Sequence, residues 1–325
     1  MSGFSADWLA LREPADHAAR NNNLLMQVAA HFADRDHLSV IDLGSGAGSN
    51  LRGVALALPA RRQSWTLVDH DPSLLTAARE RLASWADAAE TRGEELLIEK
   101  AGKEFAVDFR QADLNADIER VVGWRPDLVT AAALFDLASP EWIDRFVAAL
   151  ARDKLPLYTA LTYDGREEWR PPHARDDSIH RAFLVHQRRD KGFGPAAGPE
   201  AAPLLHSAFA HVGYRVAIAT RDIDERLVDG DAGAIDQRHR LGVADRPGLV
   251  AIGRRRIVDV AIPAALVVEV GLGQRVAGVV GLARPRRQGH AGDVLPGQRI
   301  DHRHAGQGHV AGIGHRHRVV QHVAG

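Results

Sequence analysis

Short apolar runs alternate with amphipathic segments along the first two thirds of the chain. The apolar runs cover residues 39–43, 65–69, 105–111, 127–134 and 156–162. Between them, apolar residues recur at spacings of three and four, which is typical of helices packed on a sheet. Strands that alternate with helices form parallel sheets. The pattern therefore predicts a doubly wound, mostly parallel, Rossmann-like α/β sheet with helices on both faces.

The helical patterns also extend beyond the expected strands. Expected helices cover residues 8–20, 24–32, 49–58, 73–90, 116–122, 140–151 and 200–212, and a last strand covers residues 214–219. The chain then divides into N-terminal helices (residues 1–38), an α/β domain (residues 39–220) and an irregular tail (residues 221–325).

The first expected strand leads into a loop with three alternating glycines. Residues 39–50 read Ser-Val-Ile-Asp-Leu-Gly-Ser-Gly-Ala-Gly-Ser-Asn, and glycines 44, 46 and 48 permit positive φ angles and close approach of the backbone to a ligand. Asp42, at the strand end, would repel the pyrophosphate of a dinucleotide and attract a cationic ligand such as the amino group or sulfonium of S-adenosylmethionine. Ser49 stands where the dinucleotide fingerprint has its third glycine. The loop therefore favours a cationic nucleoside.

The segment Asp42–Gly48 resembles the first signature of class I S-adenosylmethionine-dependent methyltransferases. Three later segments resemble the signatures that follow in that family: Trp65–Asp69, Phe109–Asn115 and Asp127–Leu137. The resemblance covers about residues 39–219 and implies a Rossmann-like fold, S-adenosylmethionine as methyl donor, and methyl transfer by in-line displacement.

The resemblance also implies roles for single residues. Asp69 would accept hydrogen bonds from the ribose hydroxyls, Asp113 would meet the adenine amino group, and Asp42 would lie near the methionine amino group through water or backbone. The N-terminal helices would cover the cofactor pocket, where Arg12 and Arg20 are candidates to face the cofactor carboxylate. The full set of cofactor-binding candidates is Asp42, Gly44, Ser45, Gly46, Gly48, Asn50, Asp69, His70, Asp113, Leu114 and Ala131.

Residues 163–198 form a long connection after the fifth expected strand, and we interpret it as a substrate lid. Its basic cluster Arg188-Arg189-Asp-Lys191 could meet an anionic group; a solvated helical hairpin is the alternative. The candidates for a general base are Asp136, Tyr163 and His173. Each has a lining or structural role as its alternative.

The sequence of the lid also indicates which class of acceptor and whether a metal site should be expected. Pro171-Pro172 follows the fifth strand and is flanked by Arg170 and His173, unlike the loop of amino-directed nucleic-acid methyltransferases. After the fourth strand the chain reads Ala133-Leu-Phe-Asp136, which resembles small-molecule methyltransferases, so a small-molecule acceptor is expected and nucleic acid is not. The lid histidines lack the spacing of a helical zinc pair, and the chain has no cysteine, so no metal site is expected.

The tail, residues 221–325, differs sharply in composition from the rest of the chain. All 18 aromatic residues lie at or before Tyr214, and the last Lys, Ser and Thr are Lys191, Ser207 and Thr220. The tail is rich in Gly, Arg and His, with 16 Arg against 9 Asp and 2 Glu; its net charge of +5 leaves −6 for residues 1–220.

Except for isoleucine, every residue type in the tail has a codon that begins with G or C. We hypothesise that the tail is a frame-shifted, disordered translation of a GC-rich gene. A genuine basic tail that binds nucleic acid or metal is the alternative. An alternative open frame encoding Trp, Lys and Ser past codon 220 would support the hypothesis, and its absence from the gene would exclude it.

Three functional classes follow. The first is an S-adenosylmethionine-dependent methyltransferase, the second an NAD(P)-dependent oxidoreductase, and the third a non-catalytic S-adenosylmethionine-binding protein made inactive by an aberrant C-terminus. The N-terminus lacks the features of a signal peptide, and the longest apolar run, Val260–Val268, is too short to cross a bilayer, so a cytoplasmic protein without membrane contacts is expected. The pattern predicts neither the acceptor nor the oligomeric state.

Overall fold

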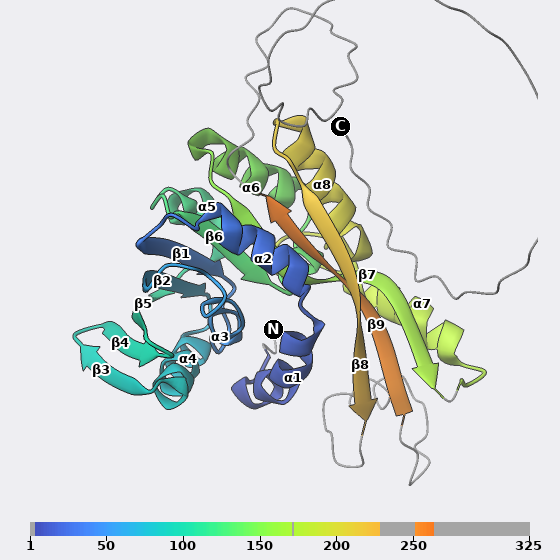
Figure 1. The fold of residues 1–325 in the computed structure, drawn as a ribbon. Helices are drawn as coiled ribbons and strands as arrows, with labels where there is room; N and C mark the ends of the chain where they lie inside the picture. Colours follow the sequence, from blue (N-terminus) through green and yellow to red (C-terminus); the bar gives the residue numbers. More distant parts are fainter. Residues whose placement is uncertain (1–3, 171, 228–250, 263–325) are drawn as a thin grey trace, which may run out of the picture. The chain divides into compact units, whose positions relative to one another are not determined.

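A computed structural model of the chain describes residues 4–170, 172–227 and 251–262. Within these residues, nine strands form one sheet in the order β3-β4-β5-β2-β1-β6-β7-β9-β8 (Figure 1). The five central strands are parallel to one another: β5 (Lys103–Gln111), β2 (Arg62–Asp69), β1 (His37–Leu43), β6 (Leu128–Ala132) and β7 (Leu157–Arg170). The predicted doubly wound, mostly parallel fold is confirmed.

The strand order also fixes where a ligand can bind. From β1 the chain crosses to β2 and β5 on one side, and then returns to β6 and β7 on the other side of β1. In open α/β sheets, ligands bind outside the carboxyl ends of the strands at such a reversal, and here these are the ends of β1 and β6. The glycine loop follows β1 at this position.

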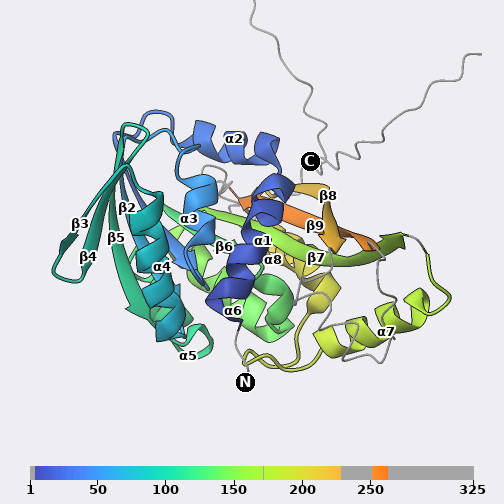
Figure 2. The ribbon, with the colours of Figure 1, turned by 90° about the horizontal axis from the view of Figure 1, so that it is seen from below.

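Helices cover both faces of the sheet (Figure 2). Their bounds are α1 Ala6–Ala19, α2 Asn22–His31, α3 Ser49–Val54, α4 Pro72–Trp85, α5 Leu114–Val122, α6 Pro140–Asp153, α7 Asp176–Gln187 and α8 Ala201–His211, with 3₁₀ turns η1 Phe135–Leu137 and η2 Gly198–Glu200. Several begin at side-chain caps: Asp71, Asp113 and Ser139 each accept a hydrogen bond from a first-turn backbone N–H. Among the described residues, no helix has the length and apolar composition that a bilayer crossing requires.

The two sheet faces have separate apolar cores. On one face, α5, α6 and α8 pack on β6 around the stacked rings of Trp142 and Phe146 and the edge of Phe209. On the other, α2, α3 and α4 pack on β1, β2 and β5 around Trp65 and Phe105, which are almost fully buried. Burial of such side chains contributes about 1.5–3 kcal/mol each, so these cores hold the strand ends in place.

The sequence pattern was wrong about the segment after α4. A helix was expected through residue 90, but α4 ends at Trp85 and a hairpin follows, with β3 (Ala88–Arg92) antiparallel to β4 (Glu95–Lys100). Alternation of buried Leu96 and Ile98 with less buried neighbours marks β4. All five residues of β3 are exposed, so its side chains carry no apolar alternation that would distinguish a strand from a helix end.

The C-terminal half of the sheet also departs from expectation. β7 continues to Arg170, so the first residues of the expected lid lie in a strand, and α7 supplies the helical part. β8 (Ala217–Leu227) pairs antiparallel with β9 (Ala251–Ile262), which in turn pairs antiparallel with β7. Two segments of the tail, residues 221–227 and 251–262, are therefore strands. The rest of the tail, and the frame-shift hypothesis with it, lies outside the described residues.

Candidate cofactor site

The glycine loop adopts the backbone that its sequence predicts. The φ angles of Gly44, Gly46 and Gly48 are 62°, 51° and 76°, a region that other residues enter only with strain. The Ser45 N–H donates to the carbonyl of Val68 on β2 at 3.0 Å, and the Gly48 N–H donates to the carbonyl of Ser45 at 2.9 Å. The loop is thus fastened to the end of β2 and turns directly into α3.

Asp69, the last residue of β2, is hydrogen bonded to the glycine loop. Its Oδ2 accepts from the Gly46 N–H at 2.8 Å, and its Oδ1 accepts from the Asp71 N–H at 3.0 Å. The Nδ1 atom of exposed His70 lies 3.3 Å from the same Oδ1. A carboxylate offers about four acceptor positions, so two remain after these backbone bonds. Asp69 is only 5% exposed and is held beside the loop.

Asp42 and Asn50 lie behind the loop. Both are buried, and the Nδ2 of Asn50 donates to Asp42 Oδ1 at 2.5 Å, while Thr130 Oγ1 on β6 donates to the same oxygen at 2.9 Å. Burial raises the pKa of Asp42 to about 6, against the lowering effects of the two hydrogen bonds and of the Arg20 charge. Asp42 Oδ2 and Asn50 Oδ1 are buried without a hydrogen-bond partner among the described residues, so the two side chains hold the base of the loop mainly through the bond between them.

The end of β5 lies beside the end of β2. The Ala112 N–H donates to the Asp69 carbonyl at 3.0 Å, and the next residue, Asp113, is exposed and caps α5 by accepting from the Asn115 N–H at 2.9 Å. Asp69 and Asp113 therefore stand on neighbouring strand ends, as the sequence predicted. Leu114 and Ala131 are buried in the core between β6 and α6, so their side chains pack there.

The exit of β6 lies next to the glycine loop. Ala133 is exposed with a φ of 52°, and the Leu134 side chain lies 3.2 Å from the position of a Cβ on Gly44. Asp136, in η1, is buried, and its Oδ1 has no hydrogen-bond partner among the described residues. Burial raises the pKa of Asp136 to about 6, although the positive charge of Arg12 lowers it.

Helix α1 packs on the glycine loop; the resemblance implied that N-terminal helices cover the cofactor pocket, but not which residues make the contact. Leu9 Cδ1 lies 3.1 Å from a Cβ position on Gly46, and His17 Nε2 lies 3.0 Å from the Ser49 carbonyl. Arg52 on α3 pairs with Glu13 at 2.6 Å. The spacing of apolar residues within a helix does not show which loop the helix covers. These contacts could therefore be identified only from the three-dimensional structure.

The two arginines expected near the cofactor carboxylate have different surroundings. Arg12 pairs with Asp16 at 2.9 Å, and its guanidinium lies 5.1 Å from the centre of the Trp8 ring. Arg20 is 2% exposed, and its charge reaches Asp42. The charge of Arg12 acts on Asp136, whereas Arg20 is buried and its charge acts on Asp42.

The other two candidate bases lie in the lid region. Tyr163 on β7 is buried, packs edge-on against Phe183 of α7, and its hydroxyl lies 3.5 Å from His180 Nε2. His173 is exposed in the turn before α7, where its backbone N–H donates to Asp176 Oδ2 at 2.7 Å and its ring Nδ1 accepts from the Arg175 N–H at 3.1 Å. Both hydrogen bonds are typical of a helix start. The exposed Arg188 and Arg189 follow α7, and a role for them toward an anion stays a prediction.

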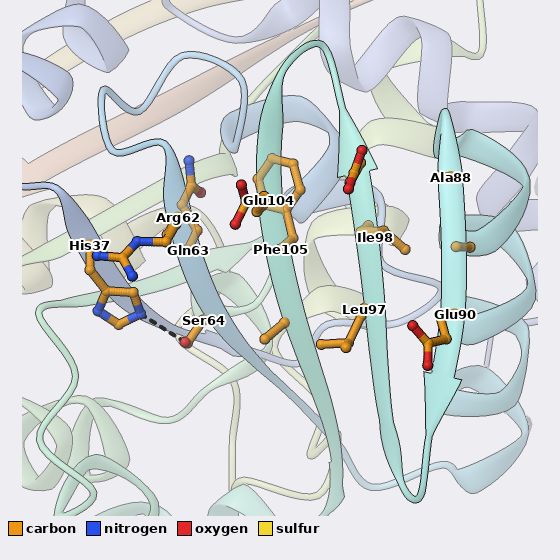
Figure 3. A pocket seen from close by; sticks show the side chains of 13 residues that line it. His37, Arg62, Gln63, Ser64, Ala88, Glu90, Leu97, Ile98, Glu104 and Phe105 are labelled. Atoms are coloured by element: carbon orange, nitrogen blue, oxygen red, sulfur yellow. Dashed lines mark hydrogen bonds between the residues drawn. The ribbon is translucent and has the colours of Figure 1, made fainter.

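A cavity of about 460 Å³ lies near the amino ends of β1, β2 and β5, whereas the glycine loop follows the carboxyl end of β1. It is lined by the first residues of β1 and β2, His37 and Arg62, and by Glu104 near the start of β5 (Figure 3). Because ligands of doubly wound sheets bind at the carboxyl ends, this cavity is separate from the candidate site.

No protein-family model and no curated protein sequence matches the chain. Similar solved structures include a protein of Bacillus halodurans described as a methyltransferase, with 13% identity, a TM-score of 0.43, and coverage of 75% of this chain and 99% of that one. Magnesium protoporphyrin IX methyltransferase from Synechocystis with bound SAH has 13% identity, a TM-score of 0.40, and coverage of 78% and 83%. An O-methyltransferase family protein from Burkholderia thailandensis has 14% identity, a TM-score of 0.43, and coverage of 78% and 56%. At these values the similarity assigns no residue a role.

The contact between α1 and the loop can be tested with two glycines. Gly46 and Gly102 both have positive φ, but a Cβ on Gly46 would press on Leu9, whereas one on Gly102 would meet nothing within 4 Å. Alanine at either position should cost about 1–2 kcal/mol through backbone strain. We expect Gly46→Ala to lower the free energy of unfolding in urea more than Gly102→Ala. Equal losses would show that α1 does not constrain the loop.

Proposed function

We propose that the chain transfers a methyl group from S-adenosylmethionine to a small-molecule acceptor. The hydrogen bond between Asp69 and Gly46 is the observation that carries this proposal, because it puts a carboxylate with spare acceptor positions beside a loop of positive-φ glycines. A nucleoside offers two ribose hydroxyls as donors to such a carboxylate. The glycine backbone leaves room for the rest of the ligand.

The charges around the loop fit a cationic ligand better than a phosphate. Asp42 and Asp69 lie at the loop and Asp136 at the exit of β6; the charges of Arg20 and Arg12 offset part of the charge of Asp42 and Asp136, and Asp69 contacts the loop directly. Arg52 does reach the loop, at the Ala47 carbonyl, but its guanidinium is held by Glu13. A pyrophosphate would meet carboxylates here, whereas an amino group or a sulfonium would be attracted to them. This charge pattern supports S-adenosylmethionine over NAD(P).

The bound donor would supply a methyl group that is already electrophilic, so the protein has to orient the reactants and exclude water. Asp69 and the glycine loop would hold the nucleoside, and the segment Ala133–Asp136 would border the reacting end. Such positioning can contribute about 7–11 kcal/mol toward the barrier. If the acceptor loses a proton, Asp136 is the candidate to accept it; with a pKa of about 6 it is mostly ionised at pH 7.5. General-base catalysis adds on the order of 10²–10⁴-fold.

The proposal is tested by measuring S-adenosylhomocysteine formation. Full-length protein is incubated with S-adenosylmethionine and a panel of hydroxyl and amine acceptors, with Asp69→Ala as the inactive control. Formation that depends on both the acceptor and Asp69 supports the proposal. Tight binding of S-adenosylmethionine without turnover on any acceptor would select the non-catalytic binding protein, and oxidation of a substrate with NAD(P) would select the oxidoreductase.

A further inference from the structure

Strand β3 forms one edge of the sheet, and all five of its residues are exposed. Natural edge strands are usually protected from pairing by lysine, proline, a bulge or a covering segment. β3 contains neither lysine nor proline, and its five residues pair with β4 in continuous register, from Ala88 opposite Glu99 to Arg92 opposite Glu95. It is therefore a regular strand without a bulge, and its charges, on Glu90 and Arg92, must be matched by any strand that pairs with it.

The hairpin that presents β3 is fastened at both ends. At its base, Lys100 pairs with Asp87 at 2.7 Å, and the same carboxylate accepts from the Ala101 N–H at 2.8 Å. At its tip, Arg79 of α4 donates to the Glu94 carbonyl at 2.5 Å, and its guanidinium stacks 4.3 Å from the Phe109 ring. A strand held in this way loses little conformational entropy when it pairs with another strand.

The charges on β3 are complementary to those of a second β3 strand that runs antiparallel to it. Glu90 and Arg92 lie on the same side of the strand, 3.6 Å apart, with side chains that are 68% and 69% exposed. In an antiparallel pair of two β3 strands with Thr91 on the two-fold axis, Glu90 of each copy would stand opposite Arg92 of the other. Opposite charges directly across an antiparallel pair stabilise it, and like charges destabilise it.

We infer that two copies of this chain associate through β3, with Thr91 on the two-fold axis, to form one sheet that continues across both copies. Glu90 and Arg92 of the two copies form a ring of alternating charges. Ala88 and Glu90, whose strand would lie against the second copy, also line the cavity described above (Figure 3). Two five-residue strands bury less than the roughly 1,200 Å² of a standard stable interface, so the dimer depends on protein concentration.

Sedimentation velocity of the full chain over a range of concentrations tests this inference. The wild-type protein should show a monomer–dimer equilibrium. Glu90→Arg, which puts like charges opposite each other, should weaken the dimer at least tenfold. The charge swap Glu90→Arg/Arg92→Glu should restore the wild-type association. Asp144→Arg, an exposed change of the same kind on α6, is the matched control and should leave the dimer unchanged.

Thr91→Pro removes a backbone donor from the edge and should abolish dimers; circular dichroism checks that this variant is folded. A protein that is monomeric at every concentration would overturn the inference. A dimer that withstands Glu90→Arg, or that the charge swap does not restore, would do so as well, because its interface would lie elsewhere.

Discussion

Asp69→Ala is expected to weaken S-adenosylhomocysteine binding at least tenfold, about 1.4 kcal/mol. The variant loses the carboxylate that would accept hydrogen bonds from the ribose, and charge-assisted hydrogen bonds are roughly twice as strong as neutral ones. It also leaves the Gly46 N–H without its acceptor, so the loop itself is loosened. Isothermal titration calorimetry measures the affinity.

A loss of stability must be separated from a loss of binding, because Asp69 supports the loop as well. A buried donor without a partner costs about 1–3 kcal/mol, so we expect Asp69→Ala to lower the melting temperature too. Asp69→Asn, which keeps one carbonyl oxygen, should retain more stability while still binding weakly. Asp108→Ala, on the same sheet and away from the loop, should change neither. Unchanged affinity in folded Asp69→Ala would remove the assigned role.

The stability of the protein should fall as the pH rises through about 6, because of Asp42. Burial raises the pKa of this fully buried carboxyl from 3.8 to about 6, so the folded state holds its proton more tightly than the unfolded state. The resulting stabilisation is complete below pH 3.8 and is lost as the pH rises through the folded pKa. It amounts to about 3 kcal/mol, of which about 1–1.5 kcal/mol is lost between pH 5 and pH 8.

Urea unfolding at pH 5 and pH 8 measures this change, and Asp42→Asn isolates it. The variant has no titrating group at this position, so its free energy of unfolding should fall less between the two pH values by about 1 kcal/mol. Asp136, whose pKa is raised in the same direction, remains in both proteins and cancels in the comparison. An identical pH dependence in the two proteins would show that the pKa of Asp42 is not raised in the folded protein.

The parts of the site that the sequence predicted are encoded locally. An apolar run followed by an acid and a glycine loop defines a strand end, which is why Asp69 and Asp113 were placed correctly on neighbouring strands. The direction of a side chain depends on packing across the sheet. Asp42 therefore turned out to be buried against Thr130 of β6, a residue 88 positions away in the chain. No local pattern contains that contact.

The same distinction explains the elements that were missed. Helix α6 was predicted almost to its ends because its large apolar residues all face one core. Strand β3 was missed because it faces solvent throughout, and the contact of Leu9 with the loop was missed because it joins α1 to a distant turn. β9 pairs with β8, the strand before it, and also with β7, which is far from it in sequence; this second pairing is a property of the assembled sheet.

The central claim is that carboxylates around the glycine loop select a cationic nucleoside over a phosphate-bearing one. Its most direct test is the melting temperature of the full-length protein with S-adenosylhomocysteine, NADH or ATP at equal concentration, since a ligand of the native state raises its stability by mass action. The account predicts that S-adenosylhomocysteine, through its amino group and ribose, raises the melting temperature and that NADH and ATP leave it unchanged. A larger rise with NADH than with S-adenosylhomocysteine would contradict it.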